Sequence, residues 1–259
     1  MASNQGVPLF IDDKRFGAYL SPVKSQRIFL TGASSGIGAA TARLLAQKGH
    51  RLILISRDLS AMKTWAESFE NNQVLVHEGD TTDAESMRLA AQEMMDRWGG
   101  IDVCIPNAGV GVFSPLSEAK LSDWHRMVDV NIKGVLNSIH ACLDALLENK
   151  GQVIQIGSVA ARSVFPNSGV YCATKHAVLA LSESLRIEFR DRLAVTTINP
   201  GAVNTAFIDQ TTNTELRESY RPTFDQGMAP DFIADAILLA IESKGRGIFS
   251  EMTVRPDLR

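Results

Sequence analysis

The sequence predicts an α/β protein with a doubly wound parallel sheet in a single domain. Five or six short apolar runs alternate with segments of helical periodicity, and the first run leads into a glycine-rich turn. Strands that are apolar along nearly their whole length are typical of a parallel sheet covered on both faces. The helical segments between them supply the long crossovers that parallel strands need.

The expected strands are the apolar runs themselves. In chain order they are Arg27–Leu30, Arg51–Ile55, Val74–His77, Ile101–Ile105, Val153–Ile156 and Ala194–Ile198. Apolar residues recur at helical spacing in Ile37–Gln47, Trp124–His140 and His176–Phe189. This order of elements indicates a Rossmann-type fold, in which ligands bind at the carboxyl ends of the strands.

Length and composition favour one folded domain. A chain of 259 residues can bury one large core, and we find no internal repeat and no Pro- or Gly-rich linker that would divide it. We therefore expect an N-terminal arm at residues 1–25 and one domain at residues 26–259. The polar segment Thr211–Pro230 predicts a mobile lid over the site, around residues 205–230.

Charge and cysteine content exclude several functions. With 26 basic and 29 acidic residues the net charge is −3, so the chain has no excess of positive charge for binding nucleic acid. Cys104, Cys142 and Cys172 form no CxxC pair, which predicts reduced thiols and no metal site. The apolar patch Val7–Ile11 is too short for a secretory signal, and no run reaches the roughly 18 apolar residues of a membrane helix. We expect a cytoplasmic protein with neither membrane nor nucleic acid as partner.

The turn between the first strand and the first helix predicts a phosphate site. Residues 31–38 read TGASSGIG, and the free backbone N–H groups at a helix N-terminus favour a pyrophosphate. The expected contacts are Gly32, Ser34, Ser35, Gly36, Ile37 and Gly38. A tight turn that binds nothing is the alternative for this motif taken alone.

The end of the second strand indicates which dinucleotide binds. NAD-selective sites of this kind place an acidic residue there, which binds the adenosine ribose. Here Ser56 is followed by Arg57, and a hydroxyl beside a guanidinium suits the 2′-phosphate of NADP(H). Ser34 or Ser35 is expected to assist. The alternative is that Arg57 is a solvated residue at a strand end.

Tyr171 and Lys175 predict a centre that transfers protons. Their spacing of four residues places a phenol and an ammonium on the same face if the segment is helical. A tyrosine has an ordinary pKa of about 10, and a neighbouring cation lowers that pKa by favouring phenolate. Taken alone, the pair is also typical of a buried ring beside a lysine whose ammonium reaches solvent.

Polar residues near later strands extend the candidate site. Ser158 follows an apolar strand, where its hydroxyl can orient a substrate oxygen, although serine there also commonly caps a turn. Asn107-Ala108-Gly109 follows the preceding expected strand. Asn131 lies inside a predicted helix, where asparagine has poor propensity, and indicates a bend or a buried polar contact.

Together these motifs resemble the short-chain dehydrogenase/reductase family in its compact single-domain branch, from about Gln26 to the C-terminus. The residues that carry the resemblance are, in order, Thr31-Gly32 through Gly38, Asp80, Asn107-Ala108-Gly109, Asn131, Ser158, Tyr171 with Lys175, and Pro200-Gly201 followed by Thr205. The resemblance implies an NADP-dependent enzyme that acts on the CH–OH group of a small carbonyl or alcohol substrate. It also implies a homo-oligomer, a tetramer or dimer, which the apolar positions of Val178–Leu185 fit.

The resemblance assigns further residues to the cofactor. Asp80 would approach the adenine, and Asn107-Ala108-Gly109 would support the sheet and the adenosine end. Val203 and Thr205 would contact the nicotinamide carboxamide. Thr81, Pro200, Gly201, Tyr171 and Lys175 are also expected to contact the cofactor.

The resemblance implies a mechanism as well. Hydride would pass directly between nicotinamide and substrate carbon while Tyr171 exchanges the proton on oxygen. Ser158 would hold that oxygen, and Lys175 would grip the nicotinamide ribose and lower the tyrosine pKa. Asn131 would hold a water that relays protons to Lys175. Because cells commonly keep NADP reduced, we expect a carbonyl reductase.

The substrate is less sharply predicted. Residues 250–256 resemble the ending of a subgroup that includes NADP-dependent serine/3-hydroxy-acid dehydrogenases and clavulanic-aldehyde reductases. The expected pocket residues are apolar, which allows a bulky substrate; they are Val110, Val112, Phe113, Val159, Ala160, Phe165 and Phe207. A hydroxy acid would need a cation, for which Arg162 and Arg221 are candidates, although Arg162 also fits a surface role. A 3-hydroxy-acid dehydrogenase and a catalytically idle NADP sensor are therefore the alternatives.

Overall fold

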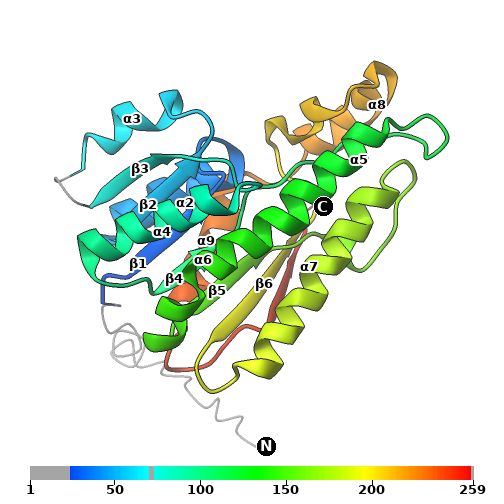
Figure 1. The fold of residues 1–259 in the computed structure, drawn as a ribbon. Coiled ribbons are helices and arrows are strands. Elements are labelled where there is room, and N and C mark those ends of the chain that lie inside the picture. Colours follow the sequence, from blue (N-terminus) through cyan, green and yellow to red (C-terminus); the bar gives the residue numbers. More distant parts are fainter. Residues whose placement is uncertain (1–23, 70–72, 258–259) are drawn as a thin grey trace, which may run out of the picture.

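The computed structural model of this chain describes residues 24–69 and 73–257. Its sheet has seven parallel strands in the order β3-β2-β1-β4-β5-β6-β7, with helices on both faces (Figure 1). This arrangement confirms the predicted doubly wound parallel sheet. The expected arm at residues 1–25 lies almost entirely outside the described residues.

Six of the strands coincide with the predicted apolar runs. The strands are β1 (Arg27–Thr31), β2 (Arg51–Ser56), β3 (Val74–Glu78), β4 (Val103–Ile105), β5 (Gln152–Ile156), β6 (Ala194–Pro200) and β7 (Glu251–Val254). The sequence prediction missed β7. This strand is only four residues long and partly exposed, so no continuous apolar run marks it, and it exists through its parallel pairing with β6.

The helices lie where the crossovers require them. They are α2 (Gly36–Gln47), α3 (Ser60–Ala66), α4 (Ala84–Trp98), α5 (Leu121–Val128), α6 (Gly134–Glu148), α7 (Gly169–Glu188), α8 (Thr214–Asp225) and α9 (Pro230–Glu242). Short helical turns are η1 (Asp129–Lys133), η2 (Val159–Ala161) and η3 (Ala206–Gln210). The predicted helix at Trp124–His140 is therefore interrupted by the π-helical turn η1.

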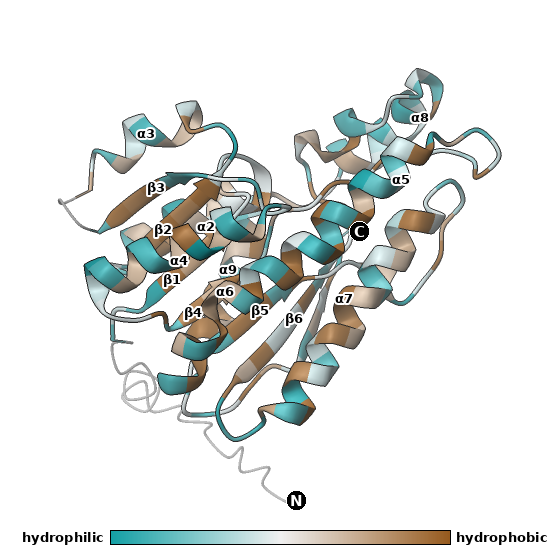
Figure 2. Ribbon diagram, viewed as in Figure 1, coloured by the Kyte–Doolittle hydropathy of each residue, from teal (hydrophilic) through white to brown (hydrophobic). Residues whose placement is uncertain are grey.

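Apolar strands and the inner faces of the helices form two core layers, one on each side of the sheet (Figure 2). On one side Leu30 and Leu54 of the sheet pack with Leu45 of α2 and Ile237 of α9. The other layer joins the sheet to α4, α6 and α7. Burial of both strand faces explains why these strands are apolar throughout rather than alternating.

The topology creates a crevice at the carboxyl edge of the sheet. Strand β1 pairs with β2 on one side and with β4 on the other, so the crossovers leave β1 in opposite directions. Ligands of open α/β sheets bind at such a switch point. Within the described residues, no helix is long and apolar enough to cross a membrane.

Candidate active site

A cavity of about 760 Å³ lies along the carboxyl ends of the strands and gathers nearly all the predicted site residues. The predicted cofactor residues all line it: Gly32, Ser34, Ser35, Gly36, Ile37, Gly38, Ser56, Arg57, Asp80, Thr81, Asn107, Ala108, Gly109, Tyr171, Lys175, Pro200, Gly201, Val203 and Thr205. Ser158 lines it too. The phosphate turn and the Tyr171–Lys175 pair therefore border one continuous space.

The turn after β1 is so closely packed that two of its positions require glycine. Gly32 has φ of +66°, and a Cβ there would lie 2.8 Å from the Cα of Ala108. A Cβ on Gly38 would lie 2.1 Å from the carbonyl oxygen of Gly32. Asn107 locks this turn, because its Nδ2 donates to the carbonyl oxygens of Thr31 and Gly32 at 2.9 and 3.2 Å.

Ser35 directly precedes α2, in extended conformation, and its side chain makes no capping hydrogen bond. The hydroxyl is thus available to a ligand at the helix N-terminus, where unpaired backbone N–H groups and the helix dipole favour an anion. The glycine turn and this free hydroxyl fit a pyrophosphate.

Ser56 and Arg57, at the end of β2, line the part of the cavity where the adenosine is expected. The Ser56 hydroxyl donates to that of Ser34 at 2.9 Å, and Arg57 is exposed. Asp80 follows β3, and its Oδ1 accepts from both the backbone N–H and the hydroxyl of Thr82 at 2.9 Å. No carboxylate stands at the Ser56 position; the nearby Asp58 accepts from the backbone N–H of Ser60 at 2.8 Å and is not among the described residues that line the cavity.

Helix α7 places the catalytic candidates of the sequence on one face. Tyr171 and Lys175 both lie in this helix and line the cavity, as their spacing predicts. The Nζ of Lys175 lies 5.9 Å from the centre of the Tyr171 ring and donates to the carbonyl oxygen of Ile156 at 2.8 Å. Ser158 lies two residues after β5, directly before η2. Its Oγ accepts from the N–H of Ala160 at 3.1 Å, so this serine caps a turn and also lines the cavity.

The pKa of Tyr171 differs from the sequence expectation. Burial raises the pKa of this phenol to about 12, against the opposing effect of the Ser158 hydroxyl. Burial also lowers the pKa of the Lys175 ammonium to about 8. The prediction that Lys175 lowers the pKa of Tyr171 is therefore wrong for this structure. The Lys175 ammonium donates its hydrogen bond to the carbonyl oxygen of Ile156. Burial of the phenol away from water therefore has the largest effect on the pKa of Tyr171.

Asn131 is the one predicted catalytic residue that does not line the cavity, as far as the described residues show. It lies in the π-helical turn η1 and is 1% exposed. Its Oδ1 accepts from Val110 N–H at 2.8 Å, while its Nδ2 donates to Val110 O at 2.8 Å and Thr174 Oγ1 at 3.0 Å. Of the two alternatives expected for this residue, the buried polar contact is present. Its side chain joins the loop after β4 to the catalytic helix.

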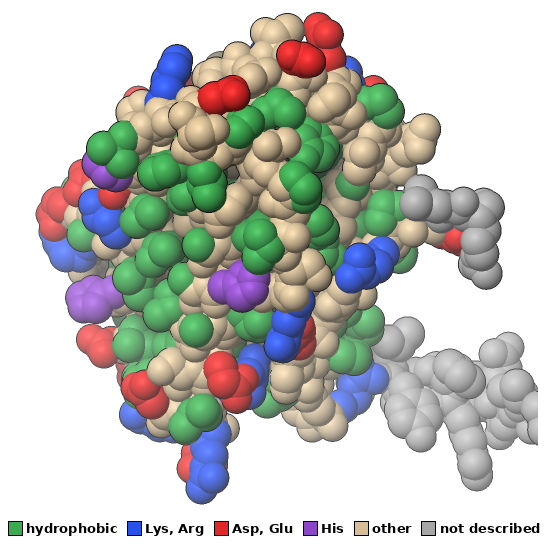
Figure 3. Space-filling model, turned by 90° about the vertical axis from the view of Figure 1, so that its right-hand side faces the viewer, with side chains coloured by type: hydrophobic (Ala, Val, Ile, Leu, Met, Phe, Trp, Pro, Cys, Tyr) green, Lys and Arg blue, Asp and Glu red, His purple; other side chains and the backbone are tan. Residues whose placement is uncertain are grey.

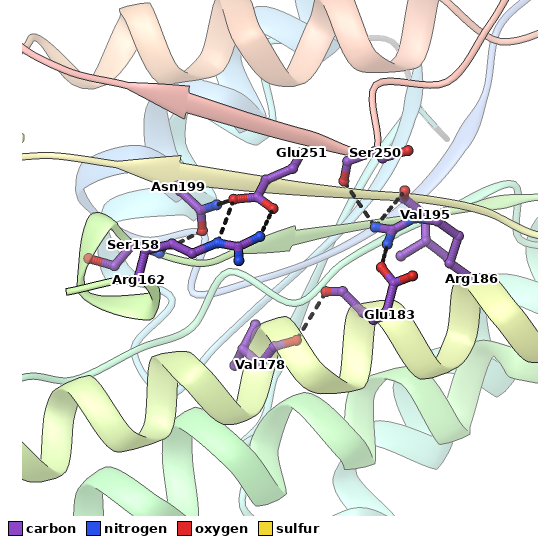
Figure 4. Close-up of polar contacts among 10 residues, drawn as sticks. Ser158, Arg162, Val178, Glu183, Arg186, Val195, Asn199, Ser250 and Glu251 are labelled. Atoms are coloured by element: carbon purple, nitrogen blue, oxygen red, sulfur yellow. Dashed lines mark hydrogen bonds and ion pairs between the residues drawn. The ribbon is translucent and has the colours of Figure 1, made fainter.

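A polar chain links the Ser158 loop to the C-terminal strand (Figure 4). Asn199 of β6 accepts from the backbone N–H of Ser158 at 3.2 Å and donates to Glu251 of β7 at 2.8 Å. Glu251 also pairs with Arg162 at 2.6 Å. Asn199 and Glu251 were not predicted as site residues, because their partners lie 41 to 89 residues away along the chain.

The two cations expected to hold a substrate carboxylate are engaged elsewhere. Arg162 is paired with Glu251, its side chain is 62% exposed, and Arg221 is paired with Asp209. In the described part of the chain neither lines the cavity. The surface interpretation of Arg162 therefore applies, and Arg221 does not supply a free cation.

Aromatic rings line the cavity around the tyrosine. Phe113 lies 5.9 Å and Phe207 5.6 Å from the Tyr171 ring, centre to centre. From α8, Tyr220 lies 5.3 Å and Phe224 6.4 Å from Phe113. Most predicted pocket residues line the cavity: Val110, Phe113, Val159, Ala160, Phe165 and Phe207.

Val112 does not belong to the lining, which corrects one prediction. It is buried, and its backbone N–H points to the sulfur of Met127 at 3.5 Å. Tyr220, Phe224 and Arg126 line the cavity but were not predicted. Tyr220 and Phe224 were missed because the segment 211–230 is mostly polar. Their contact with the cavity depends on where α8 packs, which the sequence does not display. Arg126 gives no local sequence signal.

The expected lid, residues 205–230, comprises η3 and α8 and borders the cavity. The Tyr220 hydroxyl donates to the carbonyl oxygen of Pro166 at 3.1 Å. Helix α8 is thereby joined to the loop before the catalytic helix. Its position fits a lid, and its mobility stays a prediction.

The two ends of the apolar stretch Val178–Leu185 pack into the core. Val178 is 1% exposed, and both it and Leu185 pack within the core layer of α7. Exposed large apolar residues lie on α5, α6 and the end of α7; they are Leu121, Val128, Leu136 and Ile187. Figure 3 shows many hydrophobic side chains on the face to the right in Figure 1. Self-association through this face stays a prediction.

The described residues contain no cluster of His, Cys, Asp or Glu that could hold a metal ion. Cys104, Cys142 and Cys172 are buried and unpaired as disulfides. The Cys172 thiol contacts the Ser168 hydroxyl at 3.2 Å, which agrees with a packing role.

Comparison with known proteins identifies the family. Residues 26–216 match the short chain dehydrogenase family, so the chain belongs to this family of oxidoreductases. An uncharacterized oxidoreductase of Staphylococcus saprophyticus is 35% identical over 241 residues, which cover 92% of this chain and 98% of that protein.

Solved structures share the fold. An alcohol dehydrogenase from the archaeon Thermococcus sibiricus, complexed with 5-hydroxy-NADP, is 30% identical with a TM-score of 0.81, covering 91% of this chain and 98% of that one. The closed form of a serine dehydrogenase complexed with NADP⁺ is 26% identical with a TM-score of 0.80, covering 89% and 94%. These likenesses confirm the predicted Rossmann-type fold and family.

Proposed function

We propose that this protein is an NADP(H)-dependent carbonyl reductase. The observation that carries the proposal is one cavity that holds both a glycine turn suited to pyrophosphate and the Ser158, Tyr171 and Lys175 side chains. When bound, the dinucleotide supplies or accepts hydride at its nicotinamide ring. A catalytically idle NADP sensor would need the phosphate turn but not these three side chains.

The side chains suit proton transfer to a substrate oxygen. Because burial raises the pKa of Tyr171 to about 12, its phenol stays protonated near neutral pH and can donate a proton to a carbonyl oxygen. Ser158 lies at the same end of the cavity and can orient that oxygen. Lys175 lines the same cavity and is mostly charged at neutral pH, below its lowered pKa of about 8, so its ammonium can hold a ribose hydroxyl of the dinucleotide. Protonated Tyr171 supports the reductive direction.

The proposed preference for NADP(H) rests on Ser56 and Arg57, with Ser34 held beside Ser56. We expect Arg57→Ala to weaken NADPH binding about tenfold, because it removes one charge-assisted contact with the 2′-phosphate at an exposed position. NADH binding should change by less than about threefold. Fluorescence titration of both dinucleotides measures the two affinities.

The matched control is Arg43→Ala. Arg43 lies in α2, the helix that follows the phosphate turn, and is not among the described residues that line the cavity. It should leave the NADPH to NADH affinity ratio unchanged. If Arg57→Ala lowered the affinities for NADPH and NADH by the same factor, the assignment of this residue to the 2′-phosphate would be contradicted.

Two further expectations belong to the proposal. The exposed apolar residues of α5, α6 and α7 support a homo-oligomer, a dimer or tetramer, whose mass light scattering can measure. The substrate is a small carbonyl or alcohol, with cytoplasmic location expected. The 3-hydroxy-acid alternative draws support from the likeness to serine dehydrogenase but lacks a free cation at Arg162 or Arg221.

A further inference from the structure

The part of the cavity beside Tyr171 has an aromatic wall that comes from three separate segments. Phe113 follows β4, Phe207 lies in η3, and Tyr220 and Phe224 lie in α8. We call these four residues the aromatic wall. Besides their contacts with Tyr171 and Phe113, the rings of Phe207 and Phe224 lie 6.1 Å apart, inclined by 31°. All four line the cavity, so a substrate carbonyl near the Tyr171 hydroxyl would have flat apolar surfaces beside it.

The aromatic wall itself carries no charged side chain. Among the described residues, the basic residues that line the cavity are Arg57, Arg126 and Lys175. Arg57 stands at the end of β2, beside Ser56, and Lys175 donates to Ile156. Arg126 is an exposed residue of α5. A carboxylate held against the aromatic wall would therefore lack a free buried cation, because the buried Lys175 already donates to Ile156 and Arg126 is exposed, and such burial is unfavourable.

We propose that the substrate is an uncharged carbonyl compound with an aromatic ring, or a similarly flat apolar group, next to the carbonyl. This inference rests on the proposed reductase function and specifies its substrate class. Aromatic side chains prefer offset or edge-to-face contacts with another ring, and such contacts add to simple apolar burial. Helix α8 supplies two of the four rings and is thus the specificity-determining segment.

The first test compares substrates that differ in one property. The full-length protein is assayed by NADPH oxidation with ethyl 3-oxo-3-phenylpropanoate, its free carboxylate, and ethyl 3-oxobutanoate. The neutral phenyl ester should exceed the carboxylate in kcat/KM by at least about tenfold, because only the carboxylate must lose its hydration. It should exceed the methyl-ketone ester by a similar factor, because only the phenyl ring contacts the aromatic wall.

The outcomes separate the inference from the function. Preference for the carboxylate would overturn the inference but leave the reductase function intact, and loss of that preference in Arg126→Ala would locate the carboxylate site. Equal activity on phenyl and methyl ketones would also overturn it. A protein that binds NADPH but reduces none of a broad set of aldehydes and ketones would overturn the proposed function itself.

A variant pair tests the aromatic wall directly. We expect Phe224→Leu to lower the phenyl over methyl preference at least about fivefold, because it replaces a ring with an aliphatic side chain of similar burial. Glu218→Gln, an exposed change in the same helix, should leave this ratio as it is. Binding of benzamide to the NADP⁺ complex, measured by calorimetry, gives a readout without chemistry. An unchanged preference and affinity in Phe224→Leu would contradict the role of the wall.

A second inference concerns how the Ser158 loop is held. Asn199 is fully buried in β6, and its Oδ1 is the acceptor for the Ser158 N–H. A Cβ on Gly157 would lie 2.1 Å from that oxygen, so the loop packs directly on the amide. Glu251 accepts from Asn199 Nδ2 and is itself held by Arg162, which fixes which end of the amide faces Ser158 (Figure 4).

We infer that Asn199 and Glu251 are positioning residues for Ser158. In Glu251→Ala the Nδ2 of Asn199 loses its acceptor, so the amide can rotate and release the Ser158 N–H. We expect kcat to fall about tenfold while the KM for NADPH changes by less than about twofold, since Glu251 does not line the cavity among the described residues. Glu251→Gln keeps an acceptor and should restore most of kcat.

The comparison of the alanine and glutamine variants makes this second inference testable. A purely structural role would lower the melting temperature of Glu251→Ala without a selective fall in kcat, and that result would overturn it. Equal kcat in both variants and the parent protein would overturn it as well. Arg162→Ala removes the exposed partner alone, and its effect on kcat should be smaller than that of Glu251→Ala.

Discussion

Replacing Tyr171 with phenylalanine is expected to lower turnover by about 10²- to 10⁴-fold, the usual contribution of a positioned general acid. The change removes only a hydroxyl, so the ring contacts with Phe113 and Phe207 remain. NADPH affinity should stay within about threefold of the parent protein, because the phosphate turn and Arg57 are untouched. Single-turnover NADPH oxidation and fluorescence titration measure the two effects.

Tyr220→Phe is the matched control, since it removes a phenol hydroxyl from the opposite wall of the same cavity. That hydroxyl donates to Pro166, and its loss should lower turnover by less than about tenfold. Turnover of Tyr171→Phe equal to that of the parent would show that another group donates the proton. An idle sensor would lack turnover in the parent protein as well.

The raised pKa of Tyr171 bears on the direction of the reaction. A phenol with a pKa of about 12 is a ready proton donor in carbonyl reduction but a poor base for alcohol oxidation near neutral pH. Oxidation would need the phenolate, whose fraction rises with pH below the pKa. We therefore expect alcohol oxidation to accelerate as the pH rises toward this pKa, while carbonyl reduction does not.

Residues at strand ends were predictable because the apolar runs define the strands. Once β1, β2 and β5 are located, Gly32, Ser56 and Ser158 must meet at the carboxyl edge of a parallel sheet. The spacing of Tyr171 and Lys175 needed only a helix to place both side chains at that edge. These inferences depend on local pattern and on one topological rule.

Features that depend on distant contacts were not predictable in this way. Strand β7 forms only through pairing with β6, and the chain from Ser158 through Asn199 to Glu251 follows from that pairing. The pKa of Tyr171 is set by burial, which the sequence does not display. The aromatic wall likewise requires α8 to lie across the cavity.

Replacing Gly38 with alanine is expected to lower the affinity for NADPH by about 100-fold or more. The added Cβ would lie 2.1 Å from the carbonyl oxygen of Gly32 and 2.6 Å from Asn107 Nδ2. The phosphate turn must therefore shift, and the loss of two hydrogen bonds to a charged phosphate costs about 3 kcal/mol. Because 1.4 kcal/mol corresponds to a factor of ten, about 3 kcal/mol corresponds to a loss of NADPH affinity of about 100-fold. This loss is larger than the roughly tenfold loss expected for Arg57→Ala.

The control for Gly38→Ala is Gly247→Ala, where an added Cβ meets no atom within 4 Å. Both variants make the same chemical change, so their difference reports the close approach at the turn. Calorimetric titration with NADPH gives the affinity, and thermal unfolding shows whether each variant is folded. A folded Gly38→Ala protein that binds NADPH as the parent does would mean that the dinucleotide is not held against this turn. In that case the free N-terminus of α2 would have no part in phosphate binding, and the site would have to be sought elsewhere along the cavity.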